Sequence, residues 1–210
     1  MNLYKGLPAD ELMSLLPEEQ LRHCLHVRLL VERLAAWLPE SGDGNAQALG
    51  GFGKAAYYHD IGKVCVPRNI LNKPGKLTPE EYRVVKRHPL FAQELLALGR
   101  EYNADALPPA HRSLTLSAAA YHHEWWNGQG YPFGLSGSDI PYVARVTAVC
   151  DAYDAMTSNR AYRGAFPHAY ACQELREGAG TQFDPALVNV FLEHEAEIKS
   201  MFHVAFVSGI

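Results

Sequence analysis

The sequence has few cysteines, no excess of basic residues and no long apolar run, and each absence excludes a class of protein. Its 210 residues include four scattered cysteines without a CxxC pair, so we expect reduced thiols that mostly pack. The formal net charge of −4 argues against binding to polymeric nucleic acid, which needs a basic surface. No apolar run approaches the roughly 18 residues that span a bilayer, and the start of the chain does not read as a signal peptide. A cytoplasmic protein without a membrane partner is therefore expected.

Strand-like alternation of apolar and polar residues is also lacking, and no internal repeat is present. Apolar residues make up 48% of the chain and recur at three- and four-residue spacing, which is typical of helices. The length suits one domain, and we expect an all-α fold. A loop is predicted at 67–75 and another at 127–132, where glycine, proline and asparagine cluster. Proline, glycine and capping residues bound the predicted helices, which cover 17–38, 46–60, 78–88, 90–98, 113–124, 141–156, 167–177 and 185–198, after a short amphipathic turn at 10–16.

The most informative stretch is His59-Asp60-Ile61-Gly62-Lys63, between an apolar run and Pro67. An adjacent imidazole and carboxylate can each bind a metal ion, or two ions can share the carboxylate. Lys63 follows about one helical turn later, where it could reach a phosphate bound to that metal. Taken alone, the pair has a simpler explanation as polar residues at a helix end.

Further candidate ligands are spread along the chain. Glu19 and His23 are four residues apart on a predicted helix, so they lie on one face and could converge on a metal. His88 stands before Pro89, at a predicted helix boundary. Each of these also has a plain alternative as a solvated surface residue.

His122 and His123 end an alanine-rich apolar helix. Adjacent helical residues point about 100° apart, so the two imidazoles suit two ions better than one. Asp151 follows an apolar run, where an unpaired charge would be costly to bury. Asp154 lies one turn later and could orient a ligand, or it could cap the helix or form a salt bridge. The complete set of five histidines and three carboxylates suits iron, manganese or zinc better than calcium, and it comprises Glu19, His23, His59, Asp60, His88, His122, His123 and Asp151.

Several motifs, in this order, resemble those of the HD-GYP family. They are HDIGK at 59–63, ILNKPGKLT at 70–78, HHE at 122–124, GYP at 130–132, DAYDAMTSNRAYR at 151–163 and QFDP at 182–185. The resemblance covers about residues 19–192. It implies an all-helical bundle of the HD-domain type with a GYP loop, in which 1–18 is an N-terminal extension and 19–210 is the catalytic domain. Family members usually carry an input domain, and the residues before Glu19 are too few for one; we therefore expect a chain that acts alone, is regulated in trans, or is part of a longer protein.

The resemblance also implies roles for individual residues. Asp60 is expected to bridge two divalent ions, most often iron or manganese in this family, and Glu19 corresponds to a ligand of a third. Lys63 is expected to contact the scissile phosphate and stabilise its developing charge. Arg160 and Arg163 would bind ligand phosphates, unless they are a solvated helix end. Tyr131 would lie near the substrate or, alternatively, would only pack the GYP loop.

The implied activity is metal-dependent hydrolysis of cyclic di-GMP to linear pGpG or GMP in bacterial second-messenger signalling. Two alternatives stay open: a phosphohydrolase acting on another cyclic dinucleotide or nucleotide, and a sensor that binds cyclic di-GMP without turnover. Protein partners are expected at the GYP loop, whose Trp125 and Trp126 make it unusually aromatic. The remaining histidines match no motif and are expected to be surface or capping residues; they are His26, His111, His168, His194 and His203.

Overall fold

A computed structural model of the chain describes residues 4, 6–39, 46–102, 109–159 and 164–207. Within these ranges every regular element is helical, apart from an isolated β-bridge between Ala179 and Phe183. The predicted all-α class is therefore confirmed. The elements are α1 (Ala9–Ser14), α2 (Glu18–Trp37), α3 (Ala46–Tyr57), the 3-10 helix η2 (Ile61–Cys65), α4 (Arg68–Leu71), α5 (Pro79–Val85), α6 (His88–Tyr102), α7 (Pro109–Tyr121), the 3-10 helix η3 (Gly137–Asp139), α8 (Tyr142–Thr157), α9 (His168–Gly178), α10 (Pro185–Glu193) and α11 (Glu195–Val207).

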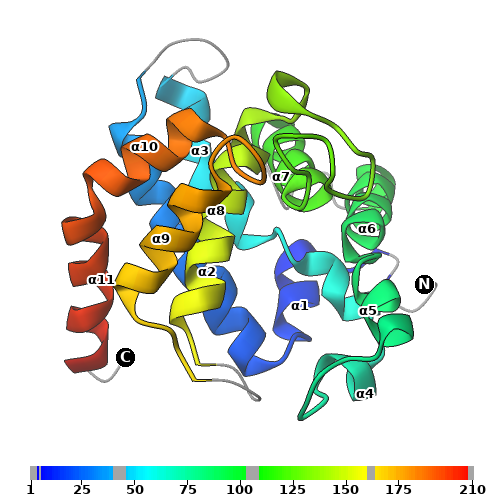
Figure 1. The fold of residues 1–210 in the computed structure, drawn as a ribbon. Coiled ribbons are helices and arrows are strands. Elements are labelled where there is room, and N and C mark those ends of the chain that lie inside the picture. Colours follow the sequence, from blue (N-terminus) through cyan, green and yellow to red (C-terminus); the bar gives the residue numbers. More distant parts are fainter. Residues whose placement is uncertain (1–3, 5, 40–45, 103–108, 160–163, 208–210) are drawn as a thin grey trace.

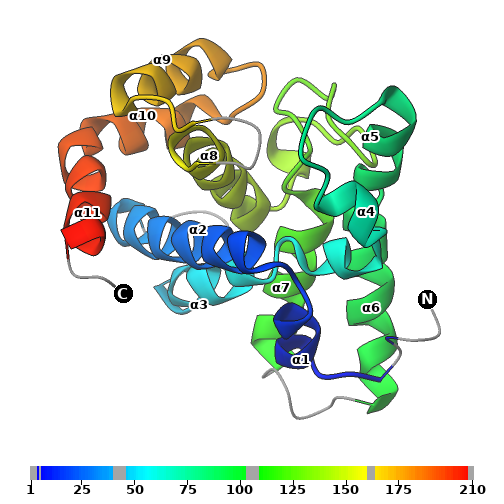
Figure 2. The same cartoon turned by 90° about the horizontal axis from the view of Figure 1, so that it is seen from below.

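Helices α2, α3, α7 and α8 lie side by side in the middle of the molecule (Figures 1 and 2). Helices α9, α10 and α11 cover one side of them, and α4, α5 and α6 lie on the other. No described helix is both long and apolar enough to cross a membrane.

Two separate apolar cores meet near residues 57–60. The larger core joins α2, α3, α8, α9 and α10 and includes Ala55 and Ala56. The smaller core joins α1, η2, α6 and α7 and includes Tyr58 and Ile61. His59 and Asp60 therefore lie where the chain passes from one core to the other, and both are fully buried. Close packing on both sides fixes their backbone.

The buried face of α2 differs from the leucine pattern in its sequence. Leu25 and Leu29, which continue the apolar spacing, are 46% and 48% exposed. The core is instead contacted by the face that includes Val27, Leu30, Val31 and Leu34. The same face carries Gln20 and His23 at its first turns, because residues three and four apart lie together on a helix. Packing of α2 therefore directs these polar side chains inward.

Several helix bounds differ from the sequence predictions. Helix α3 ends at Tyr57 rather than at Asp60, and tight turns follow in which the N–H groups of Tyr58 and His59 donate to carbonyls three residues back. The predicted loop at 67–75 contains the one-turn helix α4. The single helix predicted at 185–198 is two helices, separated at His194. No glycine or proline marks this break; the His194 ring stacks on Trp37, with ring centroids 4.0 Å apart.

The capping box predicted at Thr78 is present. The Glu81 N–H donates to the Thr78 hydroxyl, and the Thr78 N–H donates to the Glu81 carboxylate. Helix α6 then begins at His88, with Pro89 in its first turn. Proline fits there because the first helical N–H groups lack intrahelical partners. His88 is thereby held at the end of α6 that faces Asp60.

Gly62 is required by the close approach of η2 to α6. A Cβ at this position would clash with the carbonyl of His88 and lie 2.6 Å from the backbone nitrogen of Ala92. Gly62→Ala is expected to lower the free energy of unfolding by about 3 kcal/mol, because buried backbone must shift. Gly75→Ala is the matched control, since a Cβ there meets nothing within 4 Å. Denaturant unfolding measures both, and equal stabilities for the two variants would contradict this account.

Candidate metal centre

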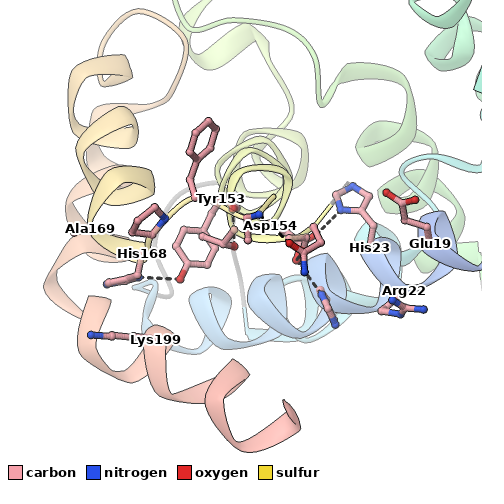
Figure 3. Close-up of a pocket in the computed structure, with 15 residues that line it drawn as sticks. Glu19, Arg22, His23, Tyr153, Asp154, His168, Ala169 and Lys199 are labelled. Atoms are coloured by element: carbon pink, nitrogen blue, oxygen red, sulfur yellow. Dashed lines mark hydrogen bonds and ion pairs between the residues drawn. The ribbon is translucent and has the colours of Figure 1, made fainter. Parts of the chain in front are cut away.

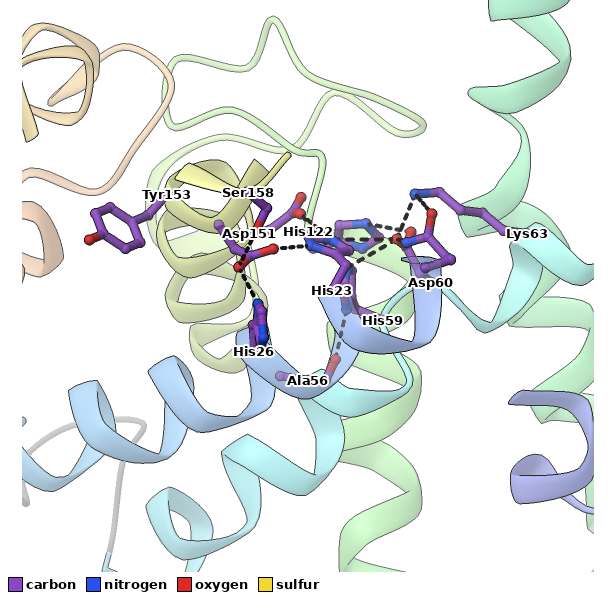
Figure 4. Close-up of polar contacts among 12 residues, drawn as sticks. His23, His26, Ala56, His59, Asp60, Lys63, His122, Asp151, Tyr153 and Ser158 are labelled. Carbon is purple, nitrogen blue, oxygen red and sulfur yellow. Dashed lines mark hydrogen bonds and ion pairs between the residues drawn. The ribbon is translucent and has the colours of Figure 1, made fainter. Parts of the chain in front are cut away.

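Two groups of potential metal ligands meet at Asp60. One group contains His88, His122 and His123, and the other contains His23, His59 and Asp151. Within each group the ligand atoms lie within 4.8 Å of one another. They come from the start of α6, the turn after α7, the middle of α8, the first turns of α2 and the turn after α3. Segments far apart in the sequence therefore converge on one place, where Figure 4 shows His23, His59, Asp60, His122 and Asp151 close together.

His122 and His123 differ from their sequence prediction. Helix α7 ends at Tyr121, so the two histidines lie in the following turn rather than on helical spacing. Both belong to one group with His88. The ring centroids of His122 and His123 are 4.1 Å apart. The prediction that they would suit two different ions is wrong for this geometry, because it assumed that the helix continued.

Backbone carbonyls determine the tautomers of three histidines. Nδ1 of His59 lies 2.7 Å from the carbonyl oxygen of Ala56. Nδ1 of His88 lies 2.8 Å from the carbonyl oxygen of Val85, and Nδ1 of His122 lies 3.0 Å from that of Ala118. A carbonyl can only accept, so each Nδ1 carries the proton. In the neutral form of each ring, Nε2 therefore carries the lone pair, and this is the form that binds metal.

The Nε2 atoms of these histidines lie close to one another and to Oδ1 of Asp60, and no hydrogen-bond donor of the described residues pairs them. Nε2 of His88 lies 3.4 Å from Nε2 of His122 and 3.1 Å from Oδ1 of Asp60. Nε2 of His59 and Oδ1 of Asp60 are buried and make no hydrogen bond with the described residues. Buried acceptors that face one another are costly, and a cation between them would remove that cost. The donor set therefore fits divalent metal ions.

Asp60 has the geometry of a bridging carboxylate. Its Oδ1 faces His88 and His122, at 3.1 and 3.9 Å from their Nε2 atoms. Its Oδ2 faces His59 and His23, at 3.3 and 3.8 Å. Burial alone would raise the pKa of Asp60, but the Lys63 ammonium and His59 outweigh burial and hold the pKa well below its usual range. The carboxylate is thus ionised, with one oxygen directed at each group.

Two imidazoles of the first group, those of His122 and His123, are neutral. Burial and the neighbouring His123 hold the pKa of His122 well below its usual range. Burial and His88 lower the pKa of His123 to about 3. Neutral imidazoles are the ligand form, so these two histidines need no deprotonation before they bind a cation.

His23 is held between two carboxylates. Its Nδ1 donates to Oδ2 of Asp154 at 2.6 Å, and its Nε2 lies 3.0 Å from Oδ1 of Asp151. Burial lowers the pKa of His23, but Asp151 and Asp154 outweigh burial and raise it to about 9. Asp154 also accepts from His26 at 3.0 Å and from Ser158 at 2.9 Å. His26, expected at the surface, thus helps to hold the carboxylate that orients His23.

Asp154→Asn is expected to weaken metal binding about 10- to 100-fold, because a carboxylate behind a metal-bound histidine fixes its orientation. The side chain keeps its size, so the fold should persist. Metal affinity is measured by isothermal titration of the metal-free protein. Glu81→Gln, which alters a carboxylate in the α5 capping box, is the control. An affinity within twofold of wild type for Asp154→Asn would contradict the orienting role.

Lys63 and Gln20 both contact Asp60. Nζ of Lys63 lies 2.6 Å from Oδ2 of Asp60, and the Gln20 side-chain amide donates to the same oxygen at 2.6 Å. The amide oxygen of Gln20 also accepts from Nζ of Lys63 at 3.3 Å. Sequence analysis missed Gln20, although it lies three residues before His23 and therefore on the same helical face. This glutamine positions both the carboxylate and the lysine.

The GYP loop is held against the centre by its own backbone. The Tyr131 ring stacks on His123, with centroids 4.7 Å apart, and its N–H donates to the His123 carbonyl. The buried Glu124 carboxylate accepts from the N–H groups of Phe133 and Leu135 at 2.6 and 3.0 Å. Tyr131 thus packs the loop against His123, as the packing interpretation of the sequence expects. It also lines a cavity of about 340 Å³ together with His122, His123 and Asp151.

Glu19 is the predicted ligand that the structure leaves outside both groups. It is exposed, one turn before His23 on α2. Both residues line a larger cavity of about 740 Å³ on the other side of Asp154 (Figure 3). Arg160 and Arg163, the predicted phosphate ligands, lie outside the described residues.

The chain is similar in sequence to a known family and to several curated proteins. The family model described as HD domain matches residues 26–187. A probable cyclic di-GMP phosphodiesterase of Vibrio cholerae is 39% identical over 170 residues, covering 81% of this chain and 38% of the relative. A cyclic di-GMP phosphodiesterase of Pseudomonas aeruginosa is 42% identical over 141 residues, covering 67% and 32%. A 3′3′-cGAMP-specific phosphodiesterase of Vibrio cholerae is 37% identical over 175 residues, covering 82% and 31%.

Among solved structures, an HD-GYP-type protein of Bdellovibrio bacteriovorus superposes with a TM-score of 0.60 at 20% identity. The match covers 80% of this chain and 49% of that one, which supports the fold. The chain spans about a third of the length of the curated relatives it matches. The family model, the motifs and the fold together show that the chain belongs to the HD domain family and is of its HD-GYP type.

Proposed function

We propose that this chain is a metal-dependent phosphodiesterase that hydrolyses cyclic di-GMP to linear pGpG, GMP or both. The observation that carries the proposal is the Asp60 carboxylate, each of whose oxygens faces a separate group of ligand atoms. Two divalent cations at such a site activate water and neutralise charge on a phosphodiester. Iron or manganese is proposed, because both accept imidazole and carboxylate ligands. A third ion is proposed to involve Glu19, which lies one turn before His23 on α2.

The proposed roles of the chain's own residues follow from the site. His23, His59, His88, His122, His123, Asp60 and Asp151 would hold the cations. Lys63 would leave Asp60 for a phosphate oxygen once cations occupy the centre, and Gln20 would limit how far it moves. In that position its charge would stabilise the transition state.

Substrate contacts are proposed on both sides of the centre. The 340 Å³ cavity next to Asp151 is lined by Tyr131, Tyr82 and Lys86, and it could receive one guanine against an aromatic ring. Lys86 Nζ lies 5.3 Å from the Tyr82 ring centroid and 5.7 Å from that of Tyr131, which places a positive charge at this edge. Arg160 and Arg163, which follow α8 in the sequence, are proposed to bind phosphate oxygens.

The substrate class is supported by the names of the relatives, which are cyclic di-GMP phosphodiesterases at 39–42% identity. A second cyclic dinucleotide has specific support, because a relative at 37% identity is named for 3′3′-cGAMP. We further propose that the protein acts in cytoplasmic second-messenger signalling, with protein partners at the GYP loop, and that residues 19–210 form the catalytic domain.

The proposal is tested by turnover of both dinucleotides. Metal-free protein is loaded with Mn²⁺ or Fe²⁺ under anaerobic conditions, and products are separated by liquid chromatography. The expected result is hydrolysis of cyclic di-GMP with a higher kcat/KM than for 3′3′-cGAMP. The reverse order would assign the second substrate. Tight binding of cyclic di-GMP without turnover by metal-loaded protein would contradict an enzyme and favour a sensor.

A further inference from the structure

The cavity of about 340 Å³ beside Asp151 has a lysine in its wall. Lys86 directly follows α5, and its Nζ lies 5.3 Å from the ring centroid of Tyr82 and 5.7 Å from that of Tyr131. Within the part of the chain that the structure describes, no carboxylate forms an ion pair with this Nζ. The ammonium therefore keeps its hydrogen-bond donors available for a ligand in the cavity.

The position of the cavity relates it to the cyclic dinucleotide of the proposed function, on which this inference rests. His122, His123 and Asp151 belong both to the cavity wall and to the two groups of metal ligands. A purine base attached to a phosphodiester at these ligands would therefore reach the cavity. The groups that line it are the ones that meet this base.

Most groups of the cavity wall do not distinguish guanine from adenine. Tyr82, Tyr131 and Trp125 offer aromatic rings, but every base has a π-face, so stacking tolerates either purine. The side-chain amides of Gln129 and Gln182 also line the cavity. An amide can donate or accept, so each can pair with either base. A preference has to come from a group whose hydrogen bonding has a fixed direction.

Lys86 is such a group, because an ammonium has three donors and no acceptor. Guanine presents two neighbouring acceptors, O6 and N7, along one edge. Adenine has the N7 acceptor on this edge, but an amino donor takes the place of O6. A lysine can thus pair with both groups of guanine, whereas adenine sets a donor against the ammonium. Contact of a basic side chain with O6 and N7 is the commonest base-specific contact in protein–DNA complexes.

We propose that Lys86 determines the base specificity of the site by donating to O6 and N7 of a guanine in this cavity. Nζ would leave the rings of Tyr82 and Tyr131 for the edge of the base, and the flexible four-carbon stem of lysine allows this movement. Lys86 would contact the base and not the reacting phosphate. Sequence analysis missed it, because a lysine at the end of a helix is ordinarily a solvated residue that complements the helix dipole.

The test compares cyclic di-GMP with cyclic di-AMP, which differ only in their bases. We expect Mn²⁺-loaded wild type to have the higher kcat/KM for cyclic di-GMP. Lys86→Met should lower the ratio of the two kcat/KM values about 10- to 100-fold, the discrimination that one good base contact provides. Lys86→Arg keeps donors for O6 and N7 and should hold the ratio within about threefold of wild type. Arg83→Met is the matched control, because Arg83 also lies on α5 but is exposed and pairs with Glu80 at 2.7 Å; it should leave the ratio unchanged.

The outcomes separate this inference from the proposed function. An equal loss for both dinucleotides in Lys86→Met would show that the lysine attracts phosphate, and it would overturn the selection of guanine while the phosphodiesterase stands. A wild type that prefers cyclic di-AMP would overturn it too. If wild type binds the dinucleotides without turnover, dissociation constants from isothermal titration give the same ratio and decide in the same way. A wild type that neither hydrolyses nor binds them would refute the proposed function and this inference together.

Discussion

Asp60→Asn is expected to lose at least about 1,000-fold in kcat/KM for cyclic di-GMP, equivalent to about 4 kcal/mol of transition-state stabilisation. The amide keeps the size of the side chain but removes the charge that both ligand groups share. One amide oxygen cannot face both groups as the two carboxylate oxygens do, and its NH₂ group cannot bind a cation. Metal content, measured by mass spectrometry, should fall together with turnover.

A matched control separates this effect from loss of a buried carboxylate in general. Asp184 is also buried, caps α10 and pairs with Arg145 at 2.8 Å. Asp184→Asn is expected to lower the free energy of unfolding by roughly 3 kcal/mol, because Arg145 loses its charged partner, and to keep its metal content. Turnover by metal-loaded Asp60→Asn within tenfold of wild type would refute the bridging role.

Lys63→Met is expected to reduce kcat about 100- to 1,000-fold while metal binding is retained. In the structure the Lys63 ammonium neutralises the Asp60 carboxylate. Because Lys63 carries the same sign of charge as a metal ion, its removal should not weaken the binding of cations to Asp60. The loss should appear in kcat because a charge aimed at the phosphate acts mainly in the transition state. Steady-state kinetics and metal titration on the same preparation measure the two effects separately.

Lys73→Met serves as the control, because Lys73 is a lysine that lies close to Lys63 in the sequence. Lys73 pairs with Glu81 at 2.6 Å, and both side chains are partly exposed. Such pairs contribute little, so kcat should stay within about twofold of wild type. A metal affinity that falls in Lys63→Met would show that the lysine holds the centre together instead of serving the phosphate.

The sequence indicated candidate ligands because histidine and carboxylate residues are distinctive types, some beside a helix boundary and Asp151 after an apolar run. It could not reveal how the ligands are oriented. The tautomers of His59 and His88 depend on carbonyls at turns whose geometry follows from packing. The length of α7 decided whether His122 and His123 face one group or two, and only tertiary contacts set that end.

Similar limits apply to the fold. Proline and the capping box predicted the starts of α5, α9 and α10 within a residue or two. The break at His194 has no local signal, because it depends on Trp37 from a distant helix. Leu25 and Leu29 suggested a core-facing stripe on α2, but their side chains point away from the core. Gln20 was overlooked because the search was for imidazole and carboxylate ligands, the types that suit iron and manganese.

Electron paramagnetic resonance of the Mn²⁺-loaded wild-type protein tests the bridged centre most directly. Two Mn²⁺ ions that share the Asp60 carboxylate should be exchange-coupled and give a multiline spectrum at two ions per chain. Isolated Mn²⁺ signals at that stoichiometry, or saturation at one ion per chain in an active preparation, would contradict the bridged pair.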